Sequence, residues 1–217
     1  MAKTQSPTKR SHRGGSYPKG ESRRKLLIES AEALLSSRSA QELTYPEIAE
    51  RAGLPLSSCY HFYRNKFALF QAVDQHLGVQ FRKYLITDMT PNNFSCWEDI
   101  INELIDRGRQ FVDRNPSAKE IWFSGNIPPA VREQVKERGQ ILGTTFKHLL
   151  AQHFVLPEIP NSKEVFFIAM EVLERFFYLA YQNAGGKDFY FEEGKKNITS
   201  YLRCYIPPYL VRKDYSE

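Results

Sequence analysis

The sequence of 217 residues predicts an all-α protein of about nine helices. Apolar residues recur at intervals of three and four along most of the chain, the spacing that puts them on one face of a helix. Stretches rich in proline, glycine and asparagine separate these segments, and no run alternates apolar and polar residues as a half-buried strand does. The expected helices lie at about residues 22–36, 44–53, 56–63, 66–85, 94–114, 117–124, 128–153, 162–183 and 189–206.

Residues 1–21 differ from the rest of the chain in composition. They are rich in Ser, Pro, Gly, Lys and Arg, and Tyr17 is their only large hydrophobic residue after Met1. The chain has a net charge of +5, yet residues 1–25 hold eight basic side chains and one acidic one, so the remainder is slightly acidic. Such a segment cannot bury enough apolar surface to offset the entropy lost on ordering. We therefore expect a disordered basic arm over residues 1–21.

Several functional classes are excluded by what the sequence lacks. No apolar run approaches the ~20 residues of a membrane helix, and no apolar stretch of a signal peptide follows the basic N-terminus. Cys59, Cys96 and Cys204 are too far apart for a CxxC metal or redox motif. Phosphate-binding glycine loops and the HExxH and GxSxG motifs are missing. We expect a cytoplasmic protein with no metal, cofactor or catalytic activity; an all-α enzyme without these motifs is an alternative.

Two short segments before residue 66 have the signals of a helix-turn-helix. Thr44 and Glu47 have the spacing of a capping box, and Pro46 is tolerated because first-turn N–H groups have no partner within the helix. Gly53 is placed to end this helix in the left-handed conformation. The second helix of such a unit enters the major groove of DNA, although glycine-containing helical hairpins also occur in proteins that do not bind DNA.

The stretch from Leu43 to Lys66, LTYPEIAERAGLPLSSCYHFYRNK, resembles the signature of TetR-type (tetracycline-repressor-like) transcriptional regulators. The resemblance covers about residues 22–86. It implies a three-helix DNA-binding domain at 22–66 and a helical ligand-binding and dimerisation domain at 67–212, with the helix that begins near Lys66 coupling the two. It further implies a ligand-released repressor that binds a palindromic operator as a homodimer. A DNA-binding protein that responds to no ligand is the alternative.

The resemblance also implies which residues contact DNA. Helix N-termini and lysine ammonium groups attract phosphate, and short serine side chains let a helix approach base edges. The expected DNA contacts are Arg23, Thr44, Ser57, Ser58, Tyr60, His61 and Lys66. Cys59 stands where the family usually has leucine, and is either a small buried hydrophobic residue or a redox-sensitive thiol. The basic arm either follows the DNA or is a solubilising tail.

The region after residue 66 has no basic character, with 18 basic and 19 acidic side chains over residues 67–217. Between residues 165 and 181, 14 of 17 residues are apolar, so this helix is buried on more than one side. One side faces its own domain, and the other faces a second subunit, a cavity or both. The resemblance places a homodimer contact at about residues 162–183 and 189–206.

Aromatic residues of the middle helices are candidates for the lining of a pocket that binds an unknown small apolar or aromatic effector. Ligand cavities are mostly apolar with few polar groups, although the same residues can form plain core. The candidates are Arg109, Phe111, Trp122, Phe123, Phe146, Met170, Glu174, Phe177 and Tyr178. In the same region, Gly139 and Gly143 mark either a close contact between helices or two weak helix positions.

Overall fold

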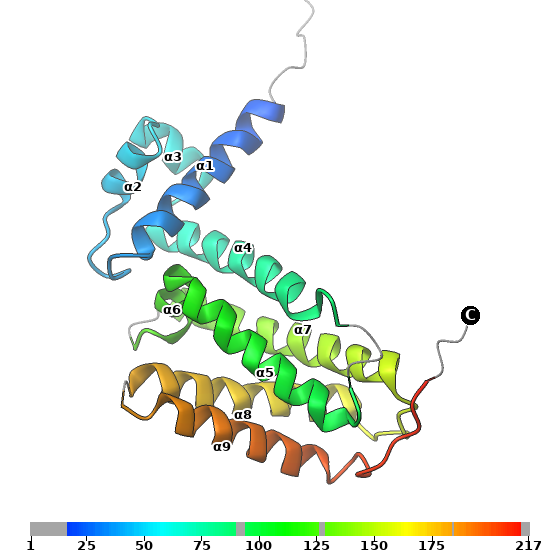
Figure 1. Ribbon diagram of the computed structural model, residues 1–217. Coiled ribbons are helices and arrows are strands. Elements are labelled where there is room, and N and C mark those ends of the chain that lie inside the picture. The colour runs from blue at the N-terminus through cyan, green and yellow to red at the C-terminus, as the bar shows by residue number, and fades with distance from the viewer. Residues whose placement is uncertain (1–16, 90–93, 126–128, 184, 214–217) are drawn as a thin grey trace, which may run out of the picture.

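The computed structural model describes residues 17–89, 94–125, 129–183 and 185–213, the side chains of 17–19 and 129–136 excepted. Over these residues the chain forms nine α-helices (Figure 1), which confirms the predicted all-α class. Most helix boundaries agree with the predicted ones to within three residues. The helices are α1 (Tyr17–Leu35), α2 (Tyr45–Arg51), α3 (Leu56–Phe62), α4 (Lys66–Ile86), α5 (Trp97–Arg114), α6 (Pro116–Phe123), α7 (Pro129–His153), α8 (Ser162–Gln182) and α9 (Lys187–Leu202).

Helix α1 begins at Tyr17 rather than at residue 22. The expectation of disorder for residues 17–21 is therefore wrong, whereas residues 1–16 of the arm lie outside the described residues. Leu27, Ala31 and Leu35 anchor the helix in the core. Once a helix is nucleated, each further residue adds a hydrogen bond at little extra cost, so the helix extends into polar sequence. Pro18 is compatible with this start because first-turn N–H groups have no partner in the helix.

The ends of the short helices are held by specific caps. Thr44 is the N-cap of α2, and its side chain and that of Glu47 form the reciprocal hydrogen bonds of a capping box, as predicted. Gly53 follows α2 with φ of 64°, the left-handed conformation expected of a glycine after a helix. Asn65 caps α4 by accepting a hydrogen bond from the Ala68 N–H at 2.9 Å. These caps set the turn before α3 and the break after it.

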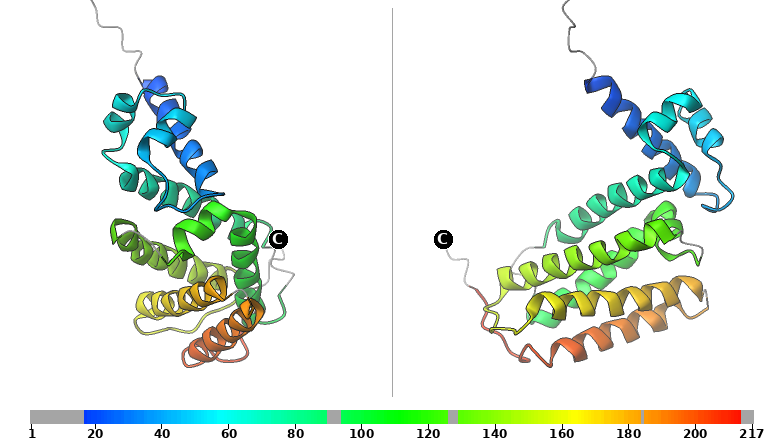
Figure 2. Two further views of the ribbon diagram at one scale, coloured as in Figure 1. Left: turned by 90° about the vertical axis from the view of Figure 1, so that its left-hand side faces the viewer. Right: turned by 180° about the vertical axis from the view of Figure 1, so that it is seen from behind.

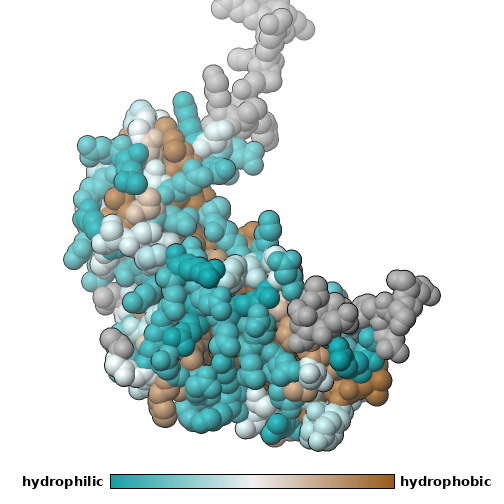
Figure 3. All heavy atoms as spheres, in the orientation of Figure 1, coloured by the Kyte–Doolittle hydropathy of each residue, from teal (hydrophilic) through white to brown (hydrophobic). Residues whose placement is uncertain are grey.

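Helix α4 lies between the two parts of the molecule. Figures 1 and 2 show α1–α3 grouped on one side of α4 and α5–α9 stacked on the other. Within the second group, α7 packs on α8 and α8 on α9. Figure 3 shows mainly hydrophilic residues over the front of this bundle. Among the described residues, no helix is both long enough and apolar enough to cross a membrane.

Helices α7 and α8 approach each other closely at Gly143. A Cβ atom on Gly143 would lie 2.9 Å from the backbone carbon and oxygen of Phe166. One turn earlier, a Cβ atom on Gly139 would lie 2.6 Å from a carboxylate oxygen of Glu171. Of the two sequence alternatives for these glycines, the structure therefore supports a close contact between helices.

Gly143→Ala is expected to lower the free energy of unfolding by about 1–3 kcal/mol, because the new methyl group meets the backbone of α8. Gly78→Ala is the matched control, since its methyl group would find its nearest neighbour, a guanidinium nitrogen of Arg82, at 3.9 Å. This control is expected to keep or raise stability by up to about 1 kcal/mol. Urea unfolding followed by circular dichroism measures both, and equal effects would contradict the close packing.

Candidate DNA-binding surface and ligand cavity

The solvent-facing side of α3 carries several residues expected to contact DNA. Ser57 and His61 are exposed and Ser58 is half-buried. Arg23 of α1 lies beside them, and these four residues together with Phe62 line one shallow depression of the surface. The fold thus brings a guanidinium from α1 next to the hydroxyl and imidazole groups of α3.

Tyr60, on the same helix, is 50% exposed. Its ring packs edge-on against the ring of Tyr45, with the ring centroids 5.0 Å apart. The Tyr45 hydroxyl in turn lies 2.8 Å from the carbonyl oxygens of both Cys59 and Tyr63. Tyr45 therefore connects α2 to the end of α3 and packs against one side of the Tyr60 ring. Half of the Tyr60 surface remains exposed to a partner.

Lys66 directs its ammonium group into the loop between α1 and α2. Its Nζ donates to the carbonyl oxygens of Ala40, Gln41 and Leu43 at 3.3, 3.1 and 2.7 Å. An ammonium group has three N–H donors, so all three are used within the protein. In this geometry Lys66 ties the start of α4 to the chain that leads into Thr44, rather than presenting its charge to a phosphate.

The Thr44 hydroxyl also stabilises the fold. It donates to Oε2 of Glu47 at 2.7 Å, while Arg38 donates to the other oxygen of the same carboxylate at 2.8 Å. The hydrogen bonds from Thr44 and then from Arg38 lower the pKa of Glu47 to about 2. The carboxylate is therefore ionised at neutral pH. Thr44 itself is exposed, at a helix N-terminus where N–H groups attract anions.

Cysteine and metal chemistry receive no support from the described residues. Cys59 is completely buried, and burial raises the pKa of its thiol. A raised pKa disfavours the reactive thiolate, which supports the interpretation of Cys59 as a small hydrophobic residue. Over the described part of the chain, no three His, Cys, Asp or Glu side chains are grouped so that they could hold a metal ion.

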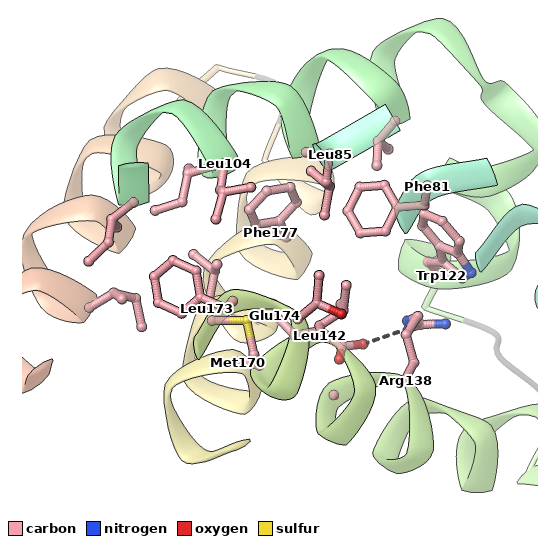
Figure 4. A pocket seen from close by; sticks show the side chains of 18 of the residues that line it. Phe81, Leu85, Leu104, Trp122, Arg138, Leu142, Met170, Leu173, Glu174 and Phe177 are labelled. Carbon is pink, nitrogen blue, oxygen red and sulfur yellow. Dashed lines mark hydrogen bonds and ion pairs between the residues drawn. The ribbon is translucent and has the colours of Figure 1, made fainter. Parts of the chain in front are cut away.

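A second candidate site is a cavity of about 100 Å³ between α4, α5, α6, α7 and α8, with one residue from α9. Figure 4 shows side chains from these helices converging on it. Most of the lining is apolar, with Arg138, Thr145 and Glu174 as polar exceptions. Six of the nine candidate residues line the cavity, namely Trp122, Phe123, Phe146, Met170, Glu174 and Phe177.

Two of the other candidates, Arg109 and Phe111 of α5, do not line the cavity. Arg109 pairs with Asp188 of α9 at 2.5 Å. Phe111 packs against the aromatic rings of α4 and α6 outside the cavity. Gly108 and Val112 of the same helix do line the cavity. Positions 109 and 111 lie at the two edges of the lining face of α5. There the Arg109 side chain turns to α9 and Phe111 packs behind the lining residues Phe81 and Trp122.

Tyr178 also does not line this cavity. Its neighbours Glu174 and Phe177 face the cavity, whereas the Tyr178 ring is covered by the guanidinium of Arg175 at 4.9 Å. The lining also contains residues that were not predicted from the sequence, and these come mainly from the inner sides of α4, α5 and α7. The missed residues are Phe81, Leu85, Ile101, Leu104, Ile105, Gly108, Val112, Arg138, Gly139, Leu142, Thr145, Leu149, Leu173 and Ile198.

One polar network crosses the cavity wall. Asp74 of α4 is only 4% exposed, and it accepts hydrogen bonds from Nε1 of Trp122 at 2.5 Å and from Nη1 of Arg138 at 2.8 Å. Nη2 of Arg138 donates to Oε1 of Glu174 at 3.1 Å, the contact drawn in Figure 4. The network therefore joins α4, α6, α7 and α8 through four side chains, namely Asp74, Trp122, Arg138 and Glu174.

The charges of this network affect one another. Burial raises the pKa of Glu174, while Arg138 lowers it and Glu171 and Asp74 raise it further. Asp74 has a signal in the sequence, because it interrupts the apolar face of α4 one turn after Phe70. Arg138 has none, since it lies in a charged segment typical of an exposed helix.

Glu174→Gln is expected to change how stability depends on pH. The pKa of Glu174 is higher in the folded state than in the unfolded state, where it is about 4.3. The protonated side chain therefore contributes fully to the free energy of unfolding below a pH of about 4.3, and this contribution is lost as pH rises through the folded-state pKa. Glutamine keeps an acceptor for Arg138 but cannot ionise. The variant should therefore gain stability relative to the wild type as pH rises through this range. Urea unfolding at several pH values measures it, with exposed Glu164→Gln as control; a difference that is constant with pH would contradict the assignment.

Comparison with known proteins follows the same division of the chain. Residues 27–73 match the family model "Bacterial regulatory proteins, tetR family", and residues 95–205 match "Tetracyclin repressor-like, C-terminal domain". No curated protein matches the chain.

Solved structures share the fold at low sequence identity. A TetR-family transcriptional regulator from Streptomyces coelicolor is 20% identical, with a TM-score of 0.65 over 85% of this chain and 99% of its own. One from Pectobacterium atrosepticum is 18% identical, with a TM-score of 0.62 over 88% and 98%. The multidrug binding protein EbrR, complexed with imidazole, is 17% identical, with a TM-score of 0.65 over 91% and 97%. The second family model alone spans half of the sequence and the first covers the helix-turn-helix, so the chain belongs to the TetR family of transcriptional regulators.

Proposed function

We propose that the protein is a ligand-released repressor that binds a palindromic DNA operator as a homodimer. The observation that carries DNA binding is the depression in which Arg23 of α1 lies beside Ser57, Ser58 and His61 of α3. Phosphate contacts position a protein on DNA, whereas base-edge contacts select the sequence. The Arg23 guanidinium suits the first task, and the short serine side chains of the recognition helix suit the second.

Thr44 and Lys66 receive different roles in this proposal. Thr44 is exposed at the N-terminus of α2, so it stays a candidate phosphate contact. The Lys66 ammonium group has its three donors directed at backbone carbonyls. We therefore assign Lys66 an indirect role, in which it sets the position of α2 against α4 and so the height of α3 above the DNA.

Homodimerisation is supported by apolar side chains that α8 and α9 leave exposed. Ile168 and Val172 lie one turn apart on α8 and are 45% and 36% exposed, and Phe189 near the start of α9 is 63% exposed. A two-fold interface brings the same surface patch of both subunits together, so this apolar surface fits a second copy of itself. A palindromic operator requires such a dimer, because two recognition helices must reach major grooves about 34 Å apart.

Release by a ligand is supported by the link between the cavity and α4. Phe81 and Leu85 of α4 line the cavity, and Asp74 of the same helix holds Trp122 and Arg138. A ligand that prefers the conformation unable to bind DNA shifts the equilibrium by its difference in affinity between the two conformations. The cavity of about 100 Å³ is smaller than the roughly 300–1,000 Å³ of most ligand pockets, so this proposal requires an effector that is compact or that enlarges the cavity.

Selection of DNA fragments bound by the full chain tests the proposal. We expect the recovered fragments to share an inverted repeat and sedimentation to give two chains per site.

Arg23→Ala should weaken binding to all fragments about equally and reduce its salt dependence, while Ser57→Ala should change the base preference. Lys66→Gln should reduce both affinity and melting temperature, whereas Arg23→Ala should leave the melting temperature unchanged. Fragments without a repeat, or one chain per site, would contradict the proposal.

A further inference from the structure

Among the described side chains, two carboxylates share one guanidinium at the cavity wall. The carboxylates of Asp74 and Glu174 both contact the one guanidinium of Arg138, which gives this cluster an excess of one negative charge when all three are ionised. Glu171, one turn before Glu174 on α8, also raises the pKa of Glu174. The cavity residues contributed by α5, α6 and α9 carry no charge.

The carboxylate in excess is the one at the cavity. Asp74 and Arg138 form the closer pair, 2.8 Å apart with side chains 5% and 10% exposed. Glu174 is 3.1 Å from Arg138, its side chain is 25% exposed, and it belongs to the cavity lining, to which Asp74 does not belong. The charge of Arg138 is therefore matched mainly by Asp74, and the charge of Glu174 is directed to whatever fills the cavity.

The aromatic lining suits the same sign of charge. The face of an aromatic ring attracts a cation, most strongly where water is excluded. Arg138 already lies 4.9 Å over the Trp122 ring. The rings of Phe81, Phe146 and Phe177 also line the cavity, and each packs against a neighbouring aromatic ring. Figure 4 shows the rings of Phe81 and Phe177 on the opposite side of the cavity from Met170 and Leu142.

We propose that the cavity binds a compact organic monocation with an apolar or aromatic body, held by the Glu174 carboxylate and the rings of Phe81 and Phe177. This inference rests on the proposed role of the cavity as the effector site and adds the chemical class of the effector. A bound cation cancels the excess charge of the cluster, a neutral ligand leaves that charge unmatched, and an anion doubles it. Burial raises the pKa of Glu174 by more than Arg138 lowers it, so a cation bound beside this carboxylate would stabilise its ionised form.

The two tryptophans of the chain provide a local readout. The Trp122 indole N–H donates to Asp74 at the cavity wall, whereas the Trp97 indole N–H donates to the Pro207 carbonyl at 2.9 Å, away from the cavity. In ¹⁵N-labelled protein their indole signals report separately on the cavity and on the rest of the fold. The probes are benzyltrimethylammonium, its neutral isostere neopentylbenzene, and the anion phenylacetate. All three are larger than benzene, which occupies a cavity of about 150 Å³, so their binding requires the side chains around this cavity of about 100 Å³ to move apart.

We expect benzyltrimethylammonium to shift the Trp122 signal saturably, to leave the Trp97 signal in place, and to bind at least about tenfold more tightly than the other two probes, a difference of about 1.4 kcal/mol. Glu174→Gln should weaken binding of the cation about tenfold and leave that of neopentylbenzene unchanged. Exposed Glu164→Gln on the same helix should alter neither. A missing Trp122 shift, equal or tighter binding of the neutral or anionic probe, or unchanged cation binding by Glu174→Gln would overturn the inference.

Failure of this inference is distinguishable from failure of the proposed function. A protein that selects an inverted repeat, but whose cavity prefers the neutral or anionic probe, remains a regulator with a different class of effector. A protein that selects no DNA, but binds the cation through Glu174, keeps the cavity assignment and loses the regulatory one. The DNA selection and the indole titration are therefore performed on the same full-length chain.

Discussion

A carboxylate on α4 is buried against a guanidinium on α7: Asp74 and Arg138 lie 2.8 Å apart, both with side chains at most 10% exposed. Removing two charges from water costs several kcal/mol, and breaking a buried pair by losing one partner costs about 3–5 kcal/mol. Helix α4 therefore cannot slide along α7 unless the pair moves with it or finds new partners. Because Trp122 and Glu174 share the same cluster and line the cavity, a molecule that enters the cavity acts directly on the interaction that positions α4.

The N-terminus of α4 is held to the helix-turn-helix by hydrogen bonds. Lys66 ties its first residue to the loop before α2, and Tyr45 of α2 holds the end of α3. A second connection runs through α6, where a carboxylate oxygen of Glu120 accepts from the Ala40 N–H at 2.8 Å. Contacts at both ends of α4 form a continuous route between the two sites, which alone does not demonstrate coupling. We propose that the position of α4 relates the cavity to the recognition helix.

Local signals in the sequence were sufficient for the fold, whereas long-range contacts decided the site. Gly53 and the caps around it predict the helix-turn-helix correctly because turns and caps depend on neighbouring residues. The start of α1 at Tyr17 does not follow from local signals, because the helix extends to this residue from the buried Leu27, Ala31 and Leu35. The direction in which Arg109 points depends on how α5 is rotated within the bundle. The periodicity of apolar residues does not determine this rotation to within one position. Asp74 and Arg138 are 64 positions apart, and no pattern in the sequence pairs them.

We propose that the Asp74–Arg138 pair sets the position of the DNA-binding helices. A double-mutant cycle on affinity for a selected operator fragment, using Asp74→Asn, Arg138→Gln and the double variant, measures it most directly. If the pair acts as one unit, each single variant lowers the affinity and the double variant lowers it no further than the weaker-binding single variant, because both changes remove the same interaction. If the single variants keep the wild-type affinity, or if their losses of binding free energy add in the double variant, the pair does not set the position of these helices.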